Sequence, residues 1–269
     1  MSAYAYVTAI TKENYSVELS DDHYGSVADK FDYFFKEFHE ANIPILIECL
    51  DLQPHHIIAD IGSGTGIIAE KLYEKCGLTK PIWCVDPSVE MQEKAWKREG
   101  TYPVLKTAEE FFSHPEIAHC FDRVISIGAA HHFADPVAVY KSIFHSLRPG
   151  GIFIEVTTMD TGYPCFKSAK KVEKAAVEIG IQKRKLIRKL VADPNVRVSE
   201  KEYCCPMSLT KSKLYEMYRR RYMSMLHQLN DEQIAEGIRE LEDGPLTDVK
   251  SHDHISFTQV IHVTKFDLN

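Results

Sequence analysis

The chain has 269 residues and a formal net charge of −7 at pH 7. This length suffices for one large domain with a small subdomain, and the acidic balance argues against nonspecific nucleic-acid binding as the main function. Residues 1–15 lack the apolar core of a signal peptide, no apolar run reaches membrane-spanning length, and the seven cysteines include no C-x-x-C pair, so we expect a cytoplasmic protein with reduced thiols, no membrane span and no metal site.

The N-terminal part changes character near residue 26. Residues 1–25 are polar with interspersed tyrosines, whereas residues 26–50 predict one long helix rich in aromatic side chains, namely Phe31, Tyr33, Phe34, Phe35 and Phe38. Pro54 separates this helix from the first strand.

A glycine-rich turn follows the first predicted strand. Residues 57–61 form a short apolar run, typical of a strand buried on both faces. Gly62, Gly64 and Gly66 come next at alternate positions, and apolar residues then recur at helical spacing from Ile67. The pattern predicts strand, turn and helix, with glycines where the backbone takes positive φ or meets a ligand, and with unpaired N–H groups at the start of the helix.

An acidic residue distinguishes this turn from the nicotinamide fingerprint. That fingerprint reads G-x-G-x-x-G, whereas this segment reads G-x-G-x-G with Asp60 two residues before the first glycine. A carboxylate there would repel a pyrophosphate. It suits a ligand with positive charge, such as the ammonium and sulfonium groups of S-adenosylmethionine.

A second buried strand, residues 82–86, ends in Asp86 and is followed by Pro87. It lies one helix after the glycine turn, as a βαβ unit requires. Asp86 can accept hydrogen bonds from both hydroxyls of a ribose. The alternative role, N-cap of a helix starting near Val89, can be filled by Ser88.

Three further strands complete the predicted parallel part of the sheet. Residues 104–105 indicate the third, before a helix start at 107–112; residues 121–127 form the fourth, before Gly128; and residues 152–156 form the fifth, after a helix at 140–147 and a turn at 148–151. His131 and Glu155 follow or end these strands. His131 is a candidate general base, with packing as the alternative, and Glu155 either reaches a substrate or caps a helix.

Basic residues dominate the segment after the fifth strand. Residues 160–190 interleave lysines and arginines with apolar residues, which predicts one or two amphipathic helices that form a lid over the substrate. The basic face could attract an anionic substrate or RNA, or simply be solvated. A sixth strand is expected within 199–209, a helix over 209–223, another over 230–241, and a last strand at 255–263. An arginine among residues 219–221 could clamp a carboxylate or phosphate, or face solvent.

The motifs resemble those of a known family. Asp-Ile-Gly-Ser-Gly-Thr-Gly at residues 60–66 resembles motif I of the class I S-adenosylmethionine-dependent methyltransferases, and Asp86, the loop after residue 127 and the Leu-Arg-Pro-Gly-Gly turn at 147–151 are similar to its later motifs in order. The resemblance covers residues 59–156. It implies an α/β fold with a doubly wound, seven-stranded, mostly parallel, Rossmann-like sheet and a small helical lid, and methyl transfer from S-adenosylmethionine with S-adenosylhomocysteine as product.

The same resemblance implies a division of the chain. Residues 1–50 would form a helical cap over the cofactor site, residues 51–158 the S-adenosylmethionine-binding core, residues 159–198 the lid, and residues 199–269 the rest of the sheet with the substrate-side helices.

The resemblance also assigns candidate site residues. The expected cofactor-binding residues are Tyr33, Asp60, Gly62, Ser63, Gly64, Gly66, Asp86, Pro87, Met91, Ala108, Glu109, Ile127 and Gly128. The substrate candidates are Tyr24, His131, Arg219 and Tyr222, and the catalytic candidates are His131 and Glu155. Several have ordinary structural alternatives: Tyr33 and Met91 also fit a helix-face core.

The segment Ser126-Ile127-Gly128-Ala129 departs from the Asn/Asp-Pro-Pro-Tyr/Phe tetrapeptide that base- and glutamine-methylating enzymes often carry there. Together with the acidic charge, this favours a small-molecule acceptor, with a carboxylic acid preferred because of the basic lid and residues 219–221. Two alternatives are an RNA or tRNA methyltransferase that uses the basic face of residues 167–189, and a non-catalytic cofactor-binding subunit. Monomer and homodimer stay open.

Overall fold

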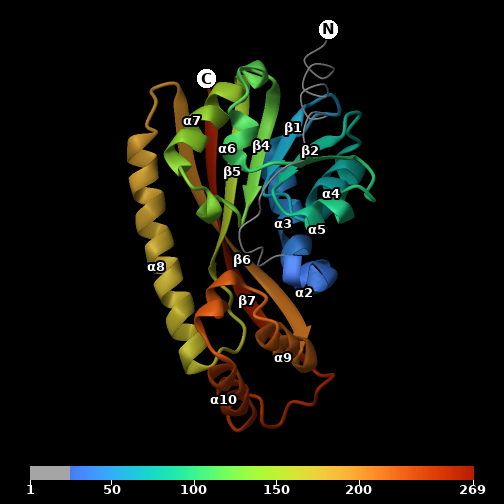
Figure 1. Cartoon of the computed structure of the whole chain (residues 1–269), viewed down its shortest axis with the longest axis vertical. Coiled ribbons are helices and arrows are strands. Elements are labelled where there is room, and N and C mark those ends of the chain that lie inside the picture. The colour runs from blue at the N-terminus through green and yellow to red at the C-terminus, as the bar shows by residue number, and fades with distance from the viewer. Residues whose placement is uncertain (1–24) are drawn as a thin grey trace.

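The fold is built on one seven-stranded sheet. A computed structural model describes residues 25–269, in which the strands lie in the order β3-β2-β1-β4-β5-β7-β6 (Figure 1). The strands are β1 (Ile58–Ile61), β2 (Ile82–Asp86), β3 (Thr101–Leu105), β4 (Phe121–Ile127), β5 (Leu147–Asp160), β6 (Val196–Thr210) and β7 (His254–Leu268). β1 to β5 pair in parallel, and β7 is antiparallel to both β5 and β6. The predicted doubly wound, mostly parallel sheet is confirmed.

Helices cover both faces of the sheet. They are α2 (Phe31–Phe34), α3 (Lys36–Leu50), α4 (Ile67–Cys76), α5 (Val89–Ala95), α6 (Ala108–Phe112), α7 (Pro136–Ser146), α8 (Lys167–Leu190), α9 (Lys211–Arg219) and α10 (Asp231–Glu242). Short 3-10 turns complete the set: η1 (Gly25–Lys30), η2 (Pro115–Ile117), η3 (Ala130–His132) and η4 (Ser224–Gln228).

Apolar packing divides into three clusters. One face of the sheet packs Trp83, Phe121 and Phe153 against α6, α7 and the end of α8. The other face packs Ile58 and Ile154 against α3 and α4. A third cluster, outside the sheet, joins the start of α8 to α9 and α10, which lie at the lower end of the molecule in Figure 1.

The prediction of one continuous helix over residues 26–50 is wrong. Phe35, with φ −96° and ψ 9°, separates α2 from α3. This break places the Phe35 ring against those of Phe31, 4.6 Å away, and Tyr222, 5.3 Å away. An aromatic contact with a distant segment therefore sets the position of the break.

The predicted helix over residues 209–223 is too long. α9 ends at Arg219, and Arg221 takes φ +44° while the Tyr222 N–H donates to the Met217 carbonyl. This is the hydrogen bond of a Schellman cap, with arginine at the position where glycine is usual. Arg220, Arg221 and Tyr222 thus lie in a turn before η4.

The lid segment forms one helix, the 24-residue α8, which runs along one side of the molecule (Figure 1). β5, β6 and β7 extend beyond their predicted ends, because they pair with one another over most of their lengths. Within residues 25–269, no helix combines the length and apolar character needed to cross a membrane.

Candidate functional site

Two neighbouring cavities open at the carboxyl ends of the parallel strands. The glycine-loop cavity has a volume of about 410 Å³ and lies over the ends of β1, β2 and β4. The lid cavity has a volume of about 280 Å³ and lies between α8, the α2–α3 segment and β5 to β7. Phe35, Phe38 and Gly128 line both, so the two cavities share a wall.

Most of the predicted cofactor-binding residues meet at the glycine-loop cavity. Eleven of the thirteen line it: Asp60, Gly62, Ser63, Gly64, Asp86, Pro87, Met91, Ala108, Glu109, Ile127 and Gly128. Gly66 is not among the lining residues; it has φ +74° and is the N-cap residue of α4. Tyr33 is 46% exposed, lies under the Lys213 ammonium and lines neither cavity.

The glycine turn is fixed by its neighbours. Gly62 and Ser63 donate to the Val85 carbonyl at 2.8 and 3.1 Å, which fastens the turn to β2. Gly62 has φ +73°, and a Cβ built on it would lie 2.2 Å from the Cβ of Ala129. Only glycine fits at this contact between the turn and the loop after β4.

Asp86 holds the turn from the other side. Its Oδ2 accepts from the Gly64 N–H at 2.8 Å, and its Oδ1 accepts from the Ser88 N–H at 2.9 Å. The N-cap of α5 is Ser88 and not Asp86, which leaves Asp86 without that structural role. Asp86 therefore shapes the cavity, and its carboxylate also lines it.

Asp60 is a buried acid in the same cavity. It is 2% exposed at the end of β1. Burial, and then the charge of Asp86, raise the pKa of Asp60 to about 8. The carboxyl group is therefore mostly protonated at neutral pH, and a cationic ligand would favour its ionised form.

Glu109 connects α6 to the loop after β4. α6 begins with a capping box formed by Thr107 and Glu110. The Glu109 carboxylate accepts from the Ala134 N–H at 2.8 Å and the Asp135 N–H at 3.3 Å. These two hydrogen bonds fix the part of the cavity wall that contains Ala108.

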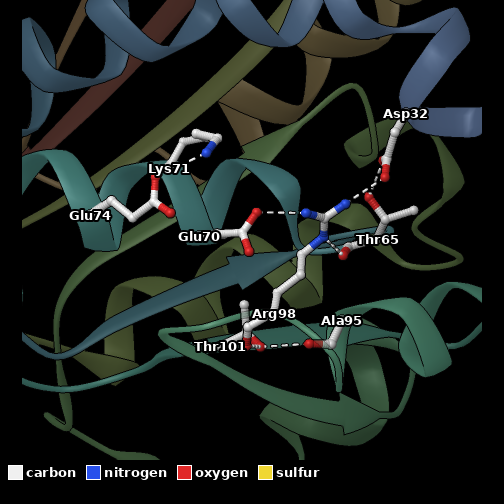
Figure 2. Close-up of polar contacts among 8 residues, drawn as sticks. All are labelled: Asp32, Thr65, Glu70, Lys71, Glu74, Ala95, Arg98 and Thr101. Atoms are coloured by element: carbon white, nitrogen blue, oxygen red, sulfur yellow. Dashed lines mark hydrogen bonds and ion pairs between the residues drawn. The ribbon is translucent and has the colours of Figure 1, made fainter.

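The α2–α3 segment covers the glycine turn and is held there by Arg98 (Figure 2). The Arg98 guanidinium donates to the Thr65 carbonyl at 2.8 Å, to Glu70 at 2.6 Å and to Asp32 at 2.5 Å. Asp32 also accepts from the Thr65 hydroxyl at 2.5 Å. One arginine thus connects the turn, α4 and the covering helix α2.

Sequence reasoning missed the aromatic wall of the glycine-loop cavity. Phe31, Phe35, Phe38 and His39 line it. Their spacing of four, seven and eight residues marks one side of a helical segment, which is the pattern that could have identified them. Burial lowers the pKa of His39 to about 4, so its imidazole is neutral at pH 7.

The lid cavity has a basic side. Lys183 and Arg184 of α8 line it. The Lys183 ammonium donates to the His131 carbonyl at 3.4 Å, and an Arg184 N–H lies 3.2 Å from the Met159 sulfur. Within residues 25–269, neither cation forms an ion pair with a carboxylate at 4.0 Å or less.

Polar groups of β5 lie beside these cations. Burial raises the pKa of Glu155, which accepts a hydrogen bond from the Tyr140 hydroxyl. The Thr157 hydroxyl oxygen is buried without a hydrogen-bond partner among the described residues. Both residues line the lid cavity, so this side combines two cations, a carboxyl group held towards its neutral form and a free hydroxyl.

The predicted substrate residues separate into two groups. His131 and Tyr222 line the lid cavity, with the Tyr222 hydroxyl hydrogen-bonded to Tyr163. Burial lowers the pKa of His131 to about 4, although its side chain is also exposed at the cavity mouth. Arg219 is exposed, with its guanidinium 5.8 Å from the Tyr215 ring centre, and lines neither cavity. Tyr24 lies outside the described residues.

The other two arginines of the run are engaged elsewhere. Arg220 lies 3.7 Å from the Asp29 carboxylate, and Arg221 forms an ion pair with Asp231 at 2.5 Å. Over residues 25–269, no group of three or more His, Cys, Asp or Glu side chains is placed to hold a metal ion.

Comparisons with known proteins agree with this geometry. Residues 59–154 match a family model described as a methyltransferase domain. A search of the curated proteins found no match. Among solved structures, the YcgJ protein from Bacillus subtilis is 17% identical, with a TM-score of 0.57 over 86% of this chain and 99% of that one.

Two further structures share the fold at similar identity. The phosphoethanolamine N-methyltransferase 2 of Haemonchus contortus, solved with phosphomonomethylethanolamine and S-adenosylhomocysteine, is 16% identical, with a TM-score of 0.55 over 91% of this chain and 57% of that one. A chain from the complex of the Trm112 methyltransferase activator of Haloferax volcanii with a methyltransferase is 15% identical, with a TM-score of 0.56 over 91% of this chain and 99% of that one.

Proposed function

We propose that the chain is a class I S-adenosylmethionine-dependent methyltransferase, with its methyltransferase domain at residues 59–154, and that its acceptor is a small carboxylic acid bound in the lid cavity. The observation that carries the proposal is the position of Lys183 and Arg184, which line a cavity that shares the wall of Phe35, Phe38 and Gly128 with the glycine-loop cavity.

The residues of the glycine-loop cavity fit the cofactor. Asp60 offers a carboxylate that would stabilise a cationic methionine end, and Asp86 offers acceptor oxygens for ribose hydroxyls. Met91 and Ala108 supply apolar contacts for an adenine ring. When bound, S-adenosylmethionine supplies an electrophilic methyl group that a carboxylate oxygen can attack directly, without a base.

The lid cavity fits an acidic acceptor. Lys183 and Arg184 would hold a carboxylate, with the Thr157 hydroxyl as a further donor. Burial raises the pKa of Glu155, which lessens its repulsion of an acidic acceptor. Apolar residues elsewhere in the wall would hold the body of the acceptor, with Phe34, Met207, Leu209, Met217 and Phe257 among them.

The structure changes which residues support a carboxylic acid as the methyl acceptor. The sequence argument used the basic lid together with the arginines at 219–221. Those arginines line neither cavity, whereas Lys183 and Arg184 of the lid segment line the lid cavity. A carboxylate acceptor carries no proton that must be removed. His131 and Glu155 are therefore expected to position the acceptor rather than act as bases. The work of the chain is then to orient the reactants and exclude water at the shared wall.

The test is a screen of small carboxylic acids against the matching amides, alcohols and amines, with isotope-labelled S-adenosylmethionine. The double variant Lys183→Gln with Arg184→Gln should raise KM for the acid by about 100-fold or more, on the scale of two charged hydrogen bonds. S-adenosylhomocysteine affinity should stay unchanged. The matched control, Lys185→Gln with Lys189→Gln, removes two exposed lysines of the same helix.

Methylation of amines alone, with no effect of the double variant, would remove the carboxylic acid from consideration. An RNA acceptor would instead show binding that falls steeply with salt and depends on the exposed lysines of α8. Turnover of any acceptor by the isolated chain would exclude a purely non-catalytic subunit.

A further inference from the structure

The solvent side of α8 carries an exposed line of aliphatic residues. Ile179, Leu186 and Leu190 are 65%, 57% and 52% exposed. Their spacing of seven and eleven residues places them on one side of the helix. The other exposed large apolar residues of the described chain are spread over different elements: Tyr33, Ile47, Val89, Trp96 and Val198.

A different side of α8 already has a packing partner. Ile187 belongs to the core on the sheet, and Ala169 belongs to the core formed with α9 and α10. The exposed aliphatic line is therefore additional to the buried face of this helix. The helix α8 itself lies along one edge of the molecule (Figure 1).

Positive charge accompanies the aliphatic line. α8 contains nine basic and two acidic residues, although the whole chain has a net charge of −7. Arg188 pairs with Glu200, and Lys183 and Arg184 line the lid cavity. Lys171, Lys174, Lys185 and Lys189 are exposed and follow one flank of the aliphatic line.

We propose that the outer face of α8, comprising Ile179, Leu186, Leu190 and these four lysines, docks on an anionic membrane surface. Helices that lie in the plane of a membrane interface combine an apolar side with lysines that meet acidic headgroups. The lysines alone cannot account for the aliphatic line, since a phosphate-tracking face needs no aliphatic side chains. A second copy of the chain is disfavoured, because three side chains offer far less than the roughly 800 Å² that each partner buries in a stable complex.

Docking of α8 would orient the lid cavity relative to the membrane surface. Gly180 and Ala176 on α8 line the lid cavity, so docking through α8 would hold that cavity close to the membrane surface. The proposal does not depend on which acceptor the enzyme uses.

The experiment is sedimentation of the full chain with vesicles of phosphatidylcholine alone and of phosphatidylcholine with about 30% phosphatidylserine. We expect binding to the anionic vesicles only, and loss of binding at high salt, despite the negative net charge of the protein. Leu186→Gln with Leu190→Gln should weaken the partition about tenfold or more. Lys185→Gln with Lys189→Gln should weaken it about 25-fold, at about fivefold for each lysine.

The matched control is Ile47→Gln with Val89→Gln, which removes two exposed aliphatic side chains from α3 and α5 and should leave binding unchanged. All variants change exposed positions, and circular dichroism with S-adenosylhomocysteine binding would verify that each is folded. Absence of wild-type binding to anionic vesicles would overturn the proposal, as would equal loss in the control. Concentration-dependent dimers that the Leu186 and Leu190 changes abolish would also overturn it, in favour of self-association, and retention on RNA through the same lysines would overturn it in favour of RNA.

Discussion

Replacing Asp60 with asparagine should remove most of the pH dependence of cofactor binding. In the unliganded chain, burial and Asp86 raise the pKa of Asp60 to about 8. The methionine end of S-adenosylmethionine carries two positive charges, so binding should favour the ionised carboxylate. The wild-type protein must therefore release a proton from Asp60 on binding whenever the pH is below about 8.

The size of this effect follows from the fraction of Asp60 that is ionised before binding. With a pKa of about 8, that fraction rises about 25-fold between pH 6.5 and pH 8.5. If only the ionised form binds well, the affinity should rise by the same factor, and at pH 7 about 0.9 proton should leave for each cofactor bound. Asp60→Asn cannot ionise, so it should bind weakly and lack this rise.

Calorimetric titration at several pH values, in buffers with different ionisation enthalpies, measures both the affinity and the number of protons released. The α-amino group of the cofactor also titrates near pH 8. That contribution is present in both proteins, so the ratio of wild-type to variant affinity isolates Asp60. A ratio that stays constant within about twofold from pH 6.5 to 8.5 would refute the reasoning.

Three further changes test other parts of the site. Gly62→Ala should cost about 2–5 kcal/mol of unfolding free energy, because its φ is +73° and its Cβ would collide with Ala129. Denaturant titration measures this loss. The control is Gly77→Ala, which has φ +59° with open space around it and should lose less. Arg98→Lys keeps the charge but cannot reach three acceptors, so hydrogen exchange should speed up in residues 25–50 and cofactor affinity should fall severalfold. Unchanged exchange would show that other contacts hold α2. In thermal melts without cofactor, the melting temperature of Asp60→Asn should exceed that of wild type by an amount that grows from pH 4 to pH 8. The reason is that wild type, whose buried acid has a raised pKa, loses stability as pH rises through that range. A difference in melting temperature that stays constant would contradict this.

The sequence was most informative where local chemistry decides the structure. Residues 57–61 and 82–86 are short, mostly apolar runs typical of strands buried on both faces of a sheet, and the structure has strands there. Asp60, Gly62, Gly64 and Asp86 lie at or just after the ends of these strands, so their convergence on one cavity follows from the parallel topology.

The sequence was least informative where contacts between distant segments decide the structure. Nothing local marks Phe35 as a break in a helix, because the break serves a contact with Tyr222. Arg221 occupies a left-handed position without the glycine that usually indicates one. The two lysine-rich sides of α8 look alike in sequence, and only packing against the sheet determines that Lys183 and Arg184 line a cavity while Lys185 and Lys189 meet solvent.

The wall of Phe35, Phe38 and Gly128 has a consequence for how the acceptor range of this enzyme can change. A substitution at these three positions alters both cavities at once, so any gain for a new acceptor is tied to a change in donor affinity. Residues of α8 and η4, such as Val177, Gly180 and Met225, line the lid cavity alone. Directed evolution towards new acceptors should therefore accumulate changes in α8 and η4 and leave the shared wall intact.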